Sequence, residues 1–234
     1  MEELLMNKSI RDILSALGLD ADKASSENSD IKVIKARTPV WFARENGKAY
    51  VCFEHNGEYY KTILRGKHQA LNAAFCVEIA KRMGIPREKI DKVLVSIPFD
   101  GRFETLSQKP LIIFDTVESS EDMKNFAMCV YDYFGRKVQA SMTTSDNIHP
   151  EPFRRLVIAD VFYPELALIK QNVTIIFTKE EFQKQYLETY NGVVKTLVMD
   201  VDTALSHATK NFPEHKIFII GGRNLYKRAI SHGY

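Results

Sequence analysis

The sequence predicts an α/β protein: a small antiparallel β-meander with helices, followed by a mostly parallel sheet covered by helices. Two Asn-Gly pairs between runs of β-branched and aromatic residues indicate the meander. Beyond residue 110, continuous apolar runs alternate with helical stretches, which is typical of strands buried on both faces. The 234 residues, 45% of them hydrophobic, leave room for two domains, which we place at residues 1–99 and 100–234.

The N-terminal region begins with a predicted helix over residues 4–17. Apolar residues recur there at helical spacing, and Gly18 fits the end of the helix. The small polar residues 20–30 then predict a loop or flexible linker. The apolar residues of this helix are Met6, Ile10, Ile13, Leu14 and Leu17.

The meander is predicted from four runs of strand-forming residues. Asn46-Gly47 and Asn56-Gly57 separate the later runs, and this residue pair suits the positive φ angles of a type I′ turn. Helices over residues 68–83 and 86–95 should follow, the first ended by a glycine and a proline. The four runs are 31–36, 40–44, 48–54 and 58–65.

The C-terminal region alternates strands with helices, which predicts a layered α/β domain. Each strand is a short uninterrupted apolar run, so both of its faces should be covered. We expect strands at 111–114, 137–142, 156–161, 173–177 and 216–220. We expect helices at 121–134, 179–190, 201–210 and 223–231.

Composition argues against several classes of protein. The formal net charge of +2 gives no reason to expect a nucleic-acid surface, and no apolar run approaches the roughly 20 residues of a membrane span. Charged residues interrupt the N-terminus, so we expect no signal peptide and a cytoplasmic protein. Three widely spaced cysteines, and six histidines without H-x-x-x-H spacing, predict neither a disulfide framework nor a metal site.

Three segments carry more specific information. They are GKHQALNAA at 66–74, DGRFE at 100–104 and LIIFDTVESSEDM at 111–123. In this order and spacing they resemble the motifs G-x-H-[NQ]-x-x-N-x-x-A, P-G-R-[FM]-E and D-x-A-H-[NT]-P-x-[SA]-[ML]. These motifs belong to the ATP-dependent Mur-type ligases, the family of the peptidoglycan Mur ligases and folylpolyglutamate synthases.

The resemblance covers roughly residues 31–234, and it implies the end of a central ATPase domain followed by a Rossmann-like C-terminal domain. It also implies ATP as a cofactor and three nucleotide-binding residues. Asn72 would contact the adenine, Arg102 would reach the nucleotide, and Asp115 would contact the ribose. An amide can donate to and accept from a purine edge, and a guanidinium suits phosphate or ribose oxygens. Ordinary alternatives are an exposed polar helix residue for Asn72 and a solvated turn residue for Arg102.

The chain departs from the family where phosphate and substrate are handled. It contains no G-x-x-x-x-G-K-[ST] loop, and Glu118 stands where the third motif has histidine. Residues 141–147 offer no lysine for the family's D-K-D segment, and residues 163–166 lack the arginine of its [HS]-P-R-A segment. Acyl-phosphate formation requires stabilised phosphoryl oxygens. We therefore expect no ligation by this chain alone, with catalytic residues unassigned and Mg²⁺ bound only if its ligands come from elsewhere.

Several functions stay open at this point. The chain can be part of a ligase and work with a partner chain that carries the phosphate loop. Alternatively, the chain can form a homo-oligomer. It can also be a non-catalytic homologue that binds a nucleotide or a partner. His68, Glu118, Gly221 and Gly222 are candidates for the phosphate or substrate side. The segment that begins with Gly221-Gly222 also resembles the G-G-x-x-x-Y turn that holds NADPH phosphate in dihydrofolate reductases. Two glycines at a helix start can bind an anion, so a reductase is a second alternative.

Overall fold

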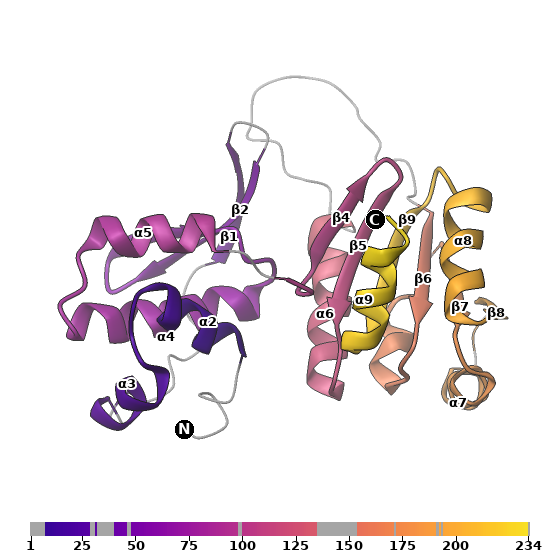
Figure 1. The fold of residues 1–234 in the computed structure, drawn as a ribbon, viewed down its shortest axis with the longest axis horizontal. Helices are drawn as coiled ribbons and strands as arrows, with labels where there is room; N and C mark the ends of the chain where they lie inside the picture. Colours follow the sequence, from indigo (N-terminus) through magenta and orange to yellow (C-terminus); the bar gives the residue numbers. More distant parts are fainter. Residues whose placement is uncertain are drawn as a thin grey trace. The chain divides into compact units, whose positions relative to one another are not determined.

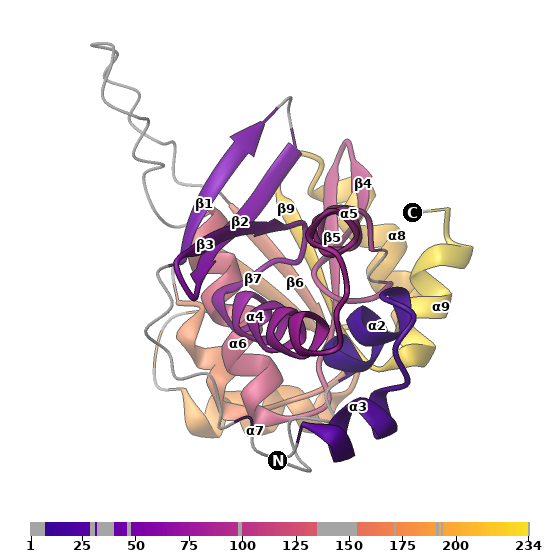
Figure 2. The same cartoon turned by 90° about the vertical axis from the view of Figure 1, so that its left-hand side faces the viewer.

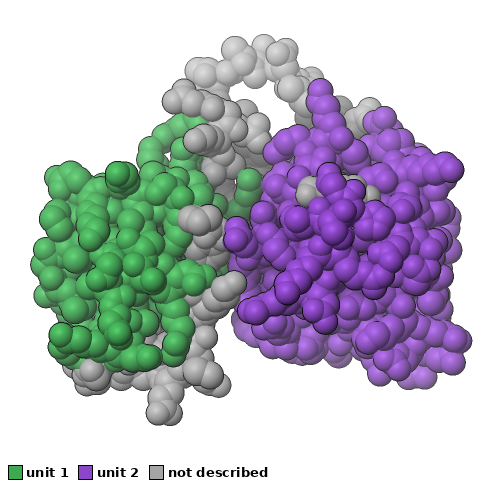
Figure 3. Space-filling model, viewed as in Figure 1, with its two compact units in different colours: residues 1–99 green, residues 100–234 purple. Residues whose placement is uncertain are grey.

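The computed structural model of the chain describes residues 8–28, 31, 40–45, 48–97, 100–134, 154–170, 172–190, 192 and 194–233. The chain divides into two compact units, residues 1–99 and 100–234, which Figure 3 draws in different colours. Each unit contains its own β-sheet. Within the described residues, no helix is long and apolar enough to cross a membrane.

Unit 1 contains the predicted antiparallel meander. Strands β1 (Val40–Glu45), β2 (Lys48–His55) and β3 (Glu58–Thr62) pair in that order. Helix α4 (Lys67–Arg82) lies against the sheet, as Figure 2 shows, and ten of its sixteen residues are buried. Helices α2 (Lys8–Ala16) and α5 (Arg87–Ser96) pack against α4, so this helix forms the centre of the unit.

The prediction of a loop over residues 20–30 is wrong, because α3 (Ala21–Glu27) is a helix. The Asp20 carboxylate accepts hydrogen bonds of 2.9 Å from the backbone N–H groups of Asp22 and Lys23, which is an N-cap. Ala24 is fully buried. Capping and burial therefore outweigh the polar composition of this segment. The predicted run 31–36 lies, apart from its first residue, outside the described part of the chain.

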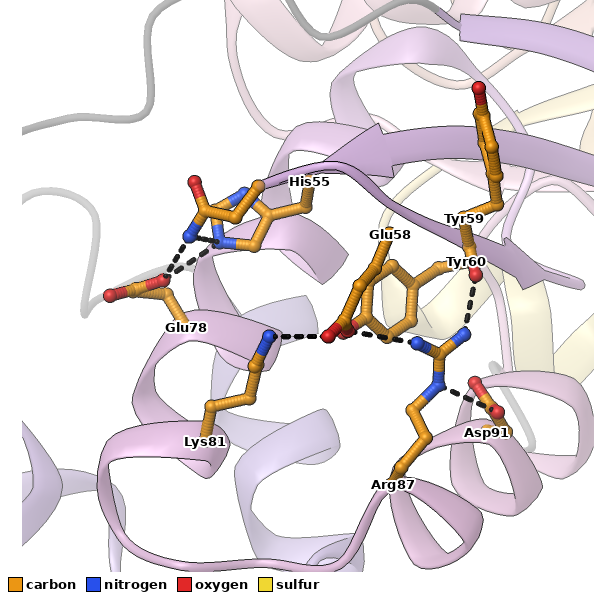
Figure 4. Close-up of polar contacts among 9 residues, drawn as sticks. His55, Glu58, Tyr59, Tyr60, Glu78, Lys81, Arg87 and Asp91 are labelled. Carbon is orange, nitrogen blue, oxygen red and sulfur yellow. Dashed lines mark hydrogen bonds and ion pairs between the residues drawn. The ribbon is translucent and has the colours of Figure 1, made fainter.

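Two groups of polar contacts join α4 and α5 to the β2–β3 hairpin (Figure 4). In one, the His55 ring contacts the Glu78 carboxylate at 2.8 Å. In the other, the Arg87 guanidinium donates to Glu58 at 2.9 Å and stacks over the Tyr60 ring. Hydrogen bonds from Tyr60 and Lys81 lower the pKa of Glu58 to about 2. These groups satisfy one another, so we assign them a structural role.

Unit 2 contains a six-stranded sheet in the order β4-β5-β9-β6-β7-β8. β4 pairs antiparallel with β5, and every other neighbouring pair is parallel, which confirms the predicted mostly parallel α/β fold. The strands are β4 (Glu104–Gln108), β5 (Leu111–Thr116), β6 (Arg155–Ala159), β7 (Val173–Phe177), β8 (Lys195–Val198) and β9 (Lys216–Gly221). The strand predicted at 137–142 lies outside the described residues.

Helices cover both faces of this sheet, as the continuous apolar runs predict (Figure 1). Alternate strand residues, such as Val157 and Ile158, enter two separate core clusters. One cluster includes residues of α6, the 3₁₀ helix η1 and α7, and the other includes residues of α8 and α9. The bounds are α6 (Ser120–Phe134), η1 (Pro164–Leu168), α7 (Glu180–Thr189), α8 (Val201–Asn211) and α9 (Arg223–Ser231).

Candidate functional site

The topology of unit 2 marks one edge of the sheet as a candidate ligand site. Neighbouring strands β5 and β9 lead into helices on opposite faces, α6 after β5 and α9 after β9 (Figure 1). Open α/β sheets bind ligands outside the carboxyl ends of their strands where such a divergence occurs. We call this part of the molecule the carboxyl edge, and it includes Thr116 of β5, Gly221 of β9 and Asp160 after β6.

The 100–104 turn is bound tightly to the carboxyl edge. The backbone N–H of Thr116 donates to the carbonyl of Gly101 at 2.7 Å. The Arg102 Nη1 atom donates in turn to the carbonyl of Thr116 at 2.9 Å. Gly101 has φ of +74°, and a Cβ added there would lie 3.0 Å from the Thr116 hydroxyl. The glycine is therefore required both by its backbone conformation and by its close approach to β5.

Asp115 and Arg102 come together at this edge. The Asp115 carboxylate accepts a 3.0 Å hydrogen bond from the backbone N–H of Phe103. Burial of the carboxyl group raises the pKa of Asp115 to about 7, against the lowering effects of the Phe103 N–H and the Arg102 charge. Phe103 has φ of +45°, unusual for a bulky residue, and its buried ring packs against Phe126 and Phe218.

The Arg102 side chain retains the capacity to bind a ligand. It is 20% exposed, and its Nη1 atom also lies 3.8 Å from Asp122. Within the described part of the chain, Arg102 contacts both Thr116 and Asp122 through its Nη1 atom. A guanidinium has five N–H donors, so donors on Nη2 and Nε can serve an anionic or hydroxyl-bearing ligand.

The start of α6 explains the nearby acidic residues structurally. The Ser119 hydroxyl accepts from the N–H of Asp122 at 3.1 Å, and the Asp122 carboxylate accepts from the N–H of Glu118 at 3.2 Å. This reciprocal arrangement resembles a capping box. The side chain of Glu118 is exposed. It therefore adds negative charge where the resemblance leads one to expect a histidine.

Gly221 and Gly222 have different roles at the carboxyl edge. A Cβ on Gly221 would lie 2.8 Å from a Leu225 side-chain atom and 3.1 Å from the Cβ of Asp160, so this glycine allows α9 to pack closely on β9. Gly222 is the N-cap residue of α9, has no side-chain cap, and faces open space. The backbone N–H groups at the start of α9 are thus available in principle to a ligand.

The candidate residues from unit 1 are placed on α4. Asn72 is buried, and its side-chain amide donates to Gln69 Oε1 at 3.3 Å. The alternative of an exposed polar residue at Asn72 is therefore wrong. His68 lies in the first turn of the same helix and is partly buried. Asn72 and His68 belong to unit 1, whereas Arg102 and Asp115 belong to unit 2.

The structure adds three polar residues that the motif comparison missed, Tyr226, Asp160 and Thr178, and it shows the contacts of Glu104 within the DGRFE segment. Glu104 and Tyr226 contact the 100–104 turn, and Tyr226 comes from α9. Asp160 accepts a hydrogen bond from the hydroxyl of Thr178, which follows β7. Asp160 and Thr178 lie at the ends of apolar runs that predict parallel strands. This position in the sequence could have marked them as candidate site residues. Among the described residues, no group of three side chains has the arrangement of a metal site.

The D-K-D equivalent was expected near residues 141–147, which lie outside the described residues. The next described strand after α6 is β6, and Asp160, Val161 and Phe162 follow it.

The chain has the α/β fold of Mur-type ligases, as solved structures show. No established family model and no curated protein matches the sequence. Solved structures do match. Folylpolyglutamate synthetase from Lactobacillus casei is 14% identical with a TM-score of 0.52, over 83% of this chain and 44% of its own. UDP-N-acetylmuramate–alanine ligase from Thermotoga maritima is 14% identical with a TM-score of 0.57, over 86% and 46%.

Folylpolyglutamate synthase from Mycobacterium tuberculosis, solved with ADP and AMPPCP, is likewise 14% identical, with a TM-score of 0.57. The match covers 85% of this chain and 48% of that one. At such identities the likeness establishes the fold. The chain spans less than half the length of each of these structures.

Proposed function

We propose that this chain is a divergent counterpart of the C-terminal portion of an ATP-dependent carboxylate–amine ligase, and that it binds the adenosine part of a nucleotide. The observation that carries the proposal is the convergence of Arg102 and Asp115 at the carboxyl edge. A carboxylate suits ribose hydroxyls, and the remaining donors of the guanidinium suit ribose or phosphate oxygens. The solved complexes of the folylpolyglutamate synthases with ADP and AMPPCP support a nucleotide as the ligand class.

The chain does not, in this proposal, catalyse ligation by itself. Its sequence contains no phosphate loop, and the carboxylates of Glu118 and Asp160 would repel phosphoryl oxygens at the carboxyl edge. A partner chain that carries the phosphate loop would supply the missing groups and the Mg²⁺ ligands. In the strand–glycine–helix unit that suggested a reductase, Gly221 allows α9 to pack closely on β9, which is a structural role for this glycine.

Calorimetry with ADP tests nucleotide binding directly. The unmodified chain should bind ADP, and Arg102→Ala should weaken binding by about tenfold or more, because a hydrogen bond to a charged group is lost. Arg228→Ala is the matched control, since Arg228 on α9 forms its ion pair with Asp202 of α8 and not with a residue of the 100–104 turn. Absence of ADP binding by the unmodified chain would overturn the proposal.

Release of ADP from ATP tests the second part. With candidate amines and carboxylates present, the purified chain should release no ADP above background. Addition of a separate protein that contains a phosphate loop and is encoded beside this chain should restore turnover if the chain is a subunit of a split ligase. Robust turnover by the chain alone would show that the proposed dependence on outside groups is wrong.

A further inference from the structure

The 100–104 turn is held by a contact between residues that lie far apart in the sequence of unit 2. The Oε2 atom of Glu104 accepts a 2.6 Å hydrogen bond from the backbone N–H of Gly101 and a 2.9 Å hydrogen bond from the hydroxyl of Tyr226. Tyr226 lies on α9, 122 residues from Glu104 in the sequence. Its ring also packs on Phe114 of β5, with 4.9 Å between ring centroids. The last helix of the chain thereby fixes the conformation of the turn.

We propose that Glu104 and Tyr226 are positioning residues, which hold the 100–104 turn so that Arg102 faces the ligand at the carboxyl edge. This inference rests on the proposed nucleotide site. Neither residue needs to touch the nucleotide. Glu104 is the acceptor that closes the turn around Gly101, and Tyr226 donates its hydroxyl to the same Oε2 atom of Glu104.

Three features of the geometry support a positioning role. Gly101 and Phe103 both have positive φ, so the turn needs contacts that keep it in this conformation. Each is held through its backbone N–H by a carboxylate, Gly101 by Glu104 and Phe103 by Asp115. Arg102 lies between these two fixed points, so its direction follows from the turn. A charged acceptor makes such hydrogen bonds stronger than neutral ones.

The pKa of the tyrosine agrees with this arrangement. Burial and the hydrogen bond to Glu104 raise the pKa of Tyr226 to about 12. The phenol therefore stays protonated and donates throughout the neutral range. Tyr226→Phe removes this donor and keeps the ring that packs on Phe114. Tyr131→Phe is a matched control, because Tyr131 donates its hydroxyl to the carbonyl of Leu168. Tyr131 also lies about 16 Å along α6 from Ser120, the first residue of that helix.

The test is ADP affinity by calorimetry in the full chain, arranged as a double-mutant cycle. Tyr226→Phe should weaken ADP binding by about tenfold, whereas Tyr131→Phe should leave it unchanged. In an Arg102→Ala background, Tyr226→Phe should have no further effect, because its action passes through Arg102. Glu104→Gln, which keeps an acceptor oxygen, should weaken ADP binding less than Glu104→Ala does.

The possible outcomes separate the two proposals. If Arg102→Ala weakens ADP binding but Tyr226→Phe behaves like Tyr131→Phe, the positioning inference is overturned and the nucleotide site stands. Full additivity of Tyr226→Phe and Arg102→Ala would also overturn it, since independent residues add. If the unmodified chain binds no ADP, the proposed function fails and the positioning role fails with it. Hydrogen exchange at the Gly101 amide tests the contact without a nucleotide. Exchange about tenfold faster in Tyr226→Phe than in the unmodified chain would show that the Tyr226–Glu104 contact holds the turn.

Discussion

Asp115 combines burial with a hydrogen bond that favours its charged form. The backbone N–H of Phe103 and the charge of Arg102 both oppose the effect of burial, yet burial dominates and the pKa rises to about 7. A carboxyl group that titrates near neutrality can change its charge when a ligand or a cation approaches. Asp115 should therefore contribute to the pH dependence of this unit.

The effect of Asp115 on stability has a definite sign. An aspartate in the unfolded chain titrates near pH ~3.9. Between that pH and about 7, the native state keeps a proton that the unfolded chain has lost, so the free energy of unfolding should fall as pH rises. Above about pH 7 this contribution should level off. Asp115→Asn, which keeps an acceptor for the Phe103 N–H, should remove it.

Urea unfolding at pH 5 and pH 8 measures this effect. The unmodified chain should lose more stability than Asp115→Asn between the two conditions, because only the carboxyl group titrates. Other groups titrate equally in both proteins and cancel in the comparison. Equal losses in the two proteins would show that Asp115 keeps an ordinary pKa.

Sequence reasoning at the residue scale found some members of the carboxyl edge and missed others. Arg102 and Asp115 were found because they lie in short motifs, and Gly221 because it follows an apolar run. Glu104 lies within the DGRFE segment, but its partner Tyr226 is 122 residues away, and no local pattern links two such positions. The burial of Asn72 depends on tertiary packing around α4, which its motif does not specify.

At the scale of elements, β9 links the core to the candidate site. Phe218 in β9 is fully buried, and its ring contacts Phe103 in the turn and Phe126 in α6, with centroid separations of 6.4 and 5.9 Å. Phe103 has positive φ and depends on this packing. The shape of the core should therefore influence the conformation of the turn.

Comparison of two phenylalanines tests this link. Phe218→Leu and Phe177→Leu change equally buried rings in β9 and β7, and each should lower the free energy of unfolding by about 1 kcal/mol. Phe177 packs on Tyr186 and makes no described ring contact with the turn. ADP binding, measured under conditions where both proteins are folded, should be weakened by Phe218→Leu alone. Equal weakening by the two variants would indicate a general loss of stability.

Elements with strong local patterns were predictable, and those defined by pairing were not. β5, β6, β7 and β9 are continuous apolar runs, and their strand character follows from burial on both faces. β8 has four residues, none of them fully buried, and β4 is a partly exposed edge strand. Each of these two strands forms because a neighbouring strand offers hydrogen bonds. The local sequence of a strand does not show which strand will lie beside it. The α3 helix was missed for a related reason, since the buried position of Ala24 is not visible in a polar segment.

At the scale of the whole molecule, the chain keeps residues suited to adenosine and lacks a loop suited to phosphate. A series of ligands separates these two properties. Adenosine, ADP and ATP should bind with similar affinity, within about threefold, because added phosphates meet carboxylates and no phosphate loop. Calorimetry at one fixed salt concentration measures the series. An affinity that rises steeply with each phosphate would contradict this prediction and would indicate a phosphate site elsewhere in the chain.

The strand order has a consequence for the synthesis of the protein. β9 is the last of the six strands to leave the ribosome, yet it lies in the middle of the sheet, between β5 and β6. Until it emerges, the nascent chain can form only two separate half-sheets, β4–β5 and β6–β7–β8, and β5 and β6 each present an unpaired edge. The same late segment brings Gly221 and Tyr226 to the turn. The sheet and the candidate site therefore both require β9 and α9, so both can be completed only after this segment has been translated.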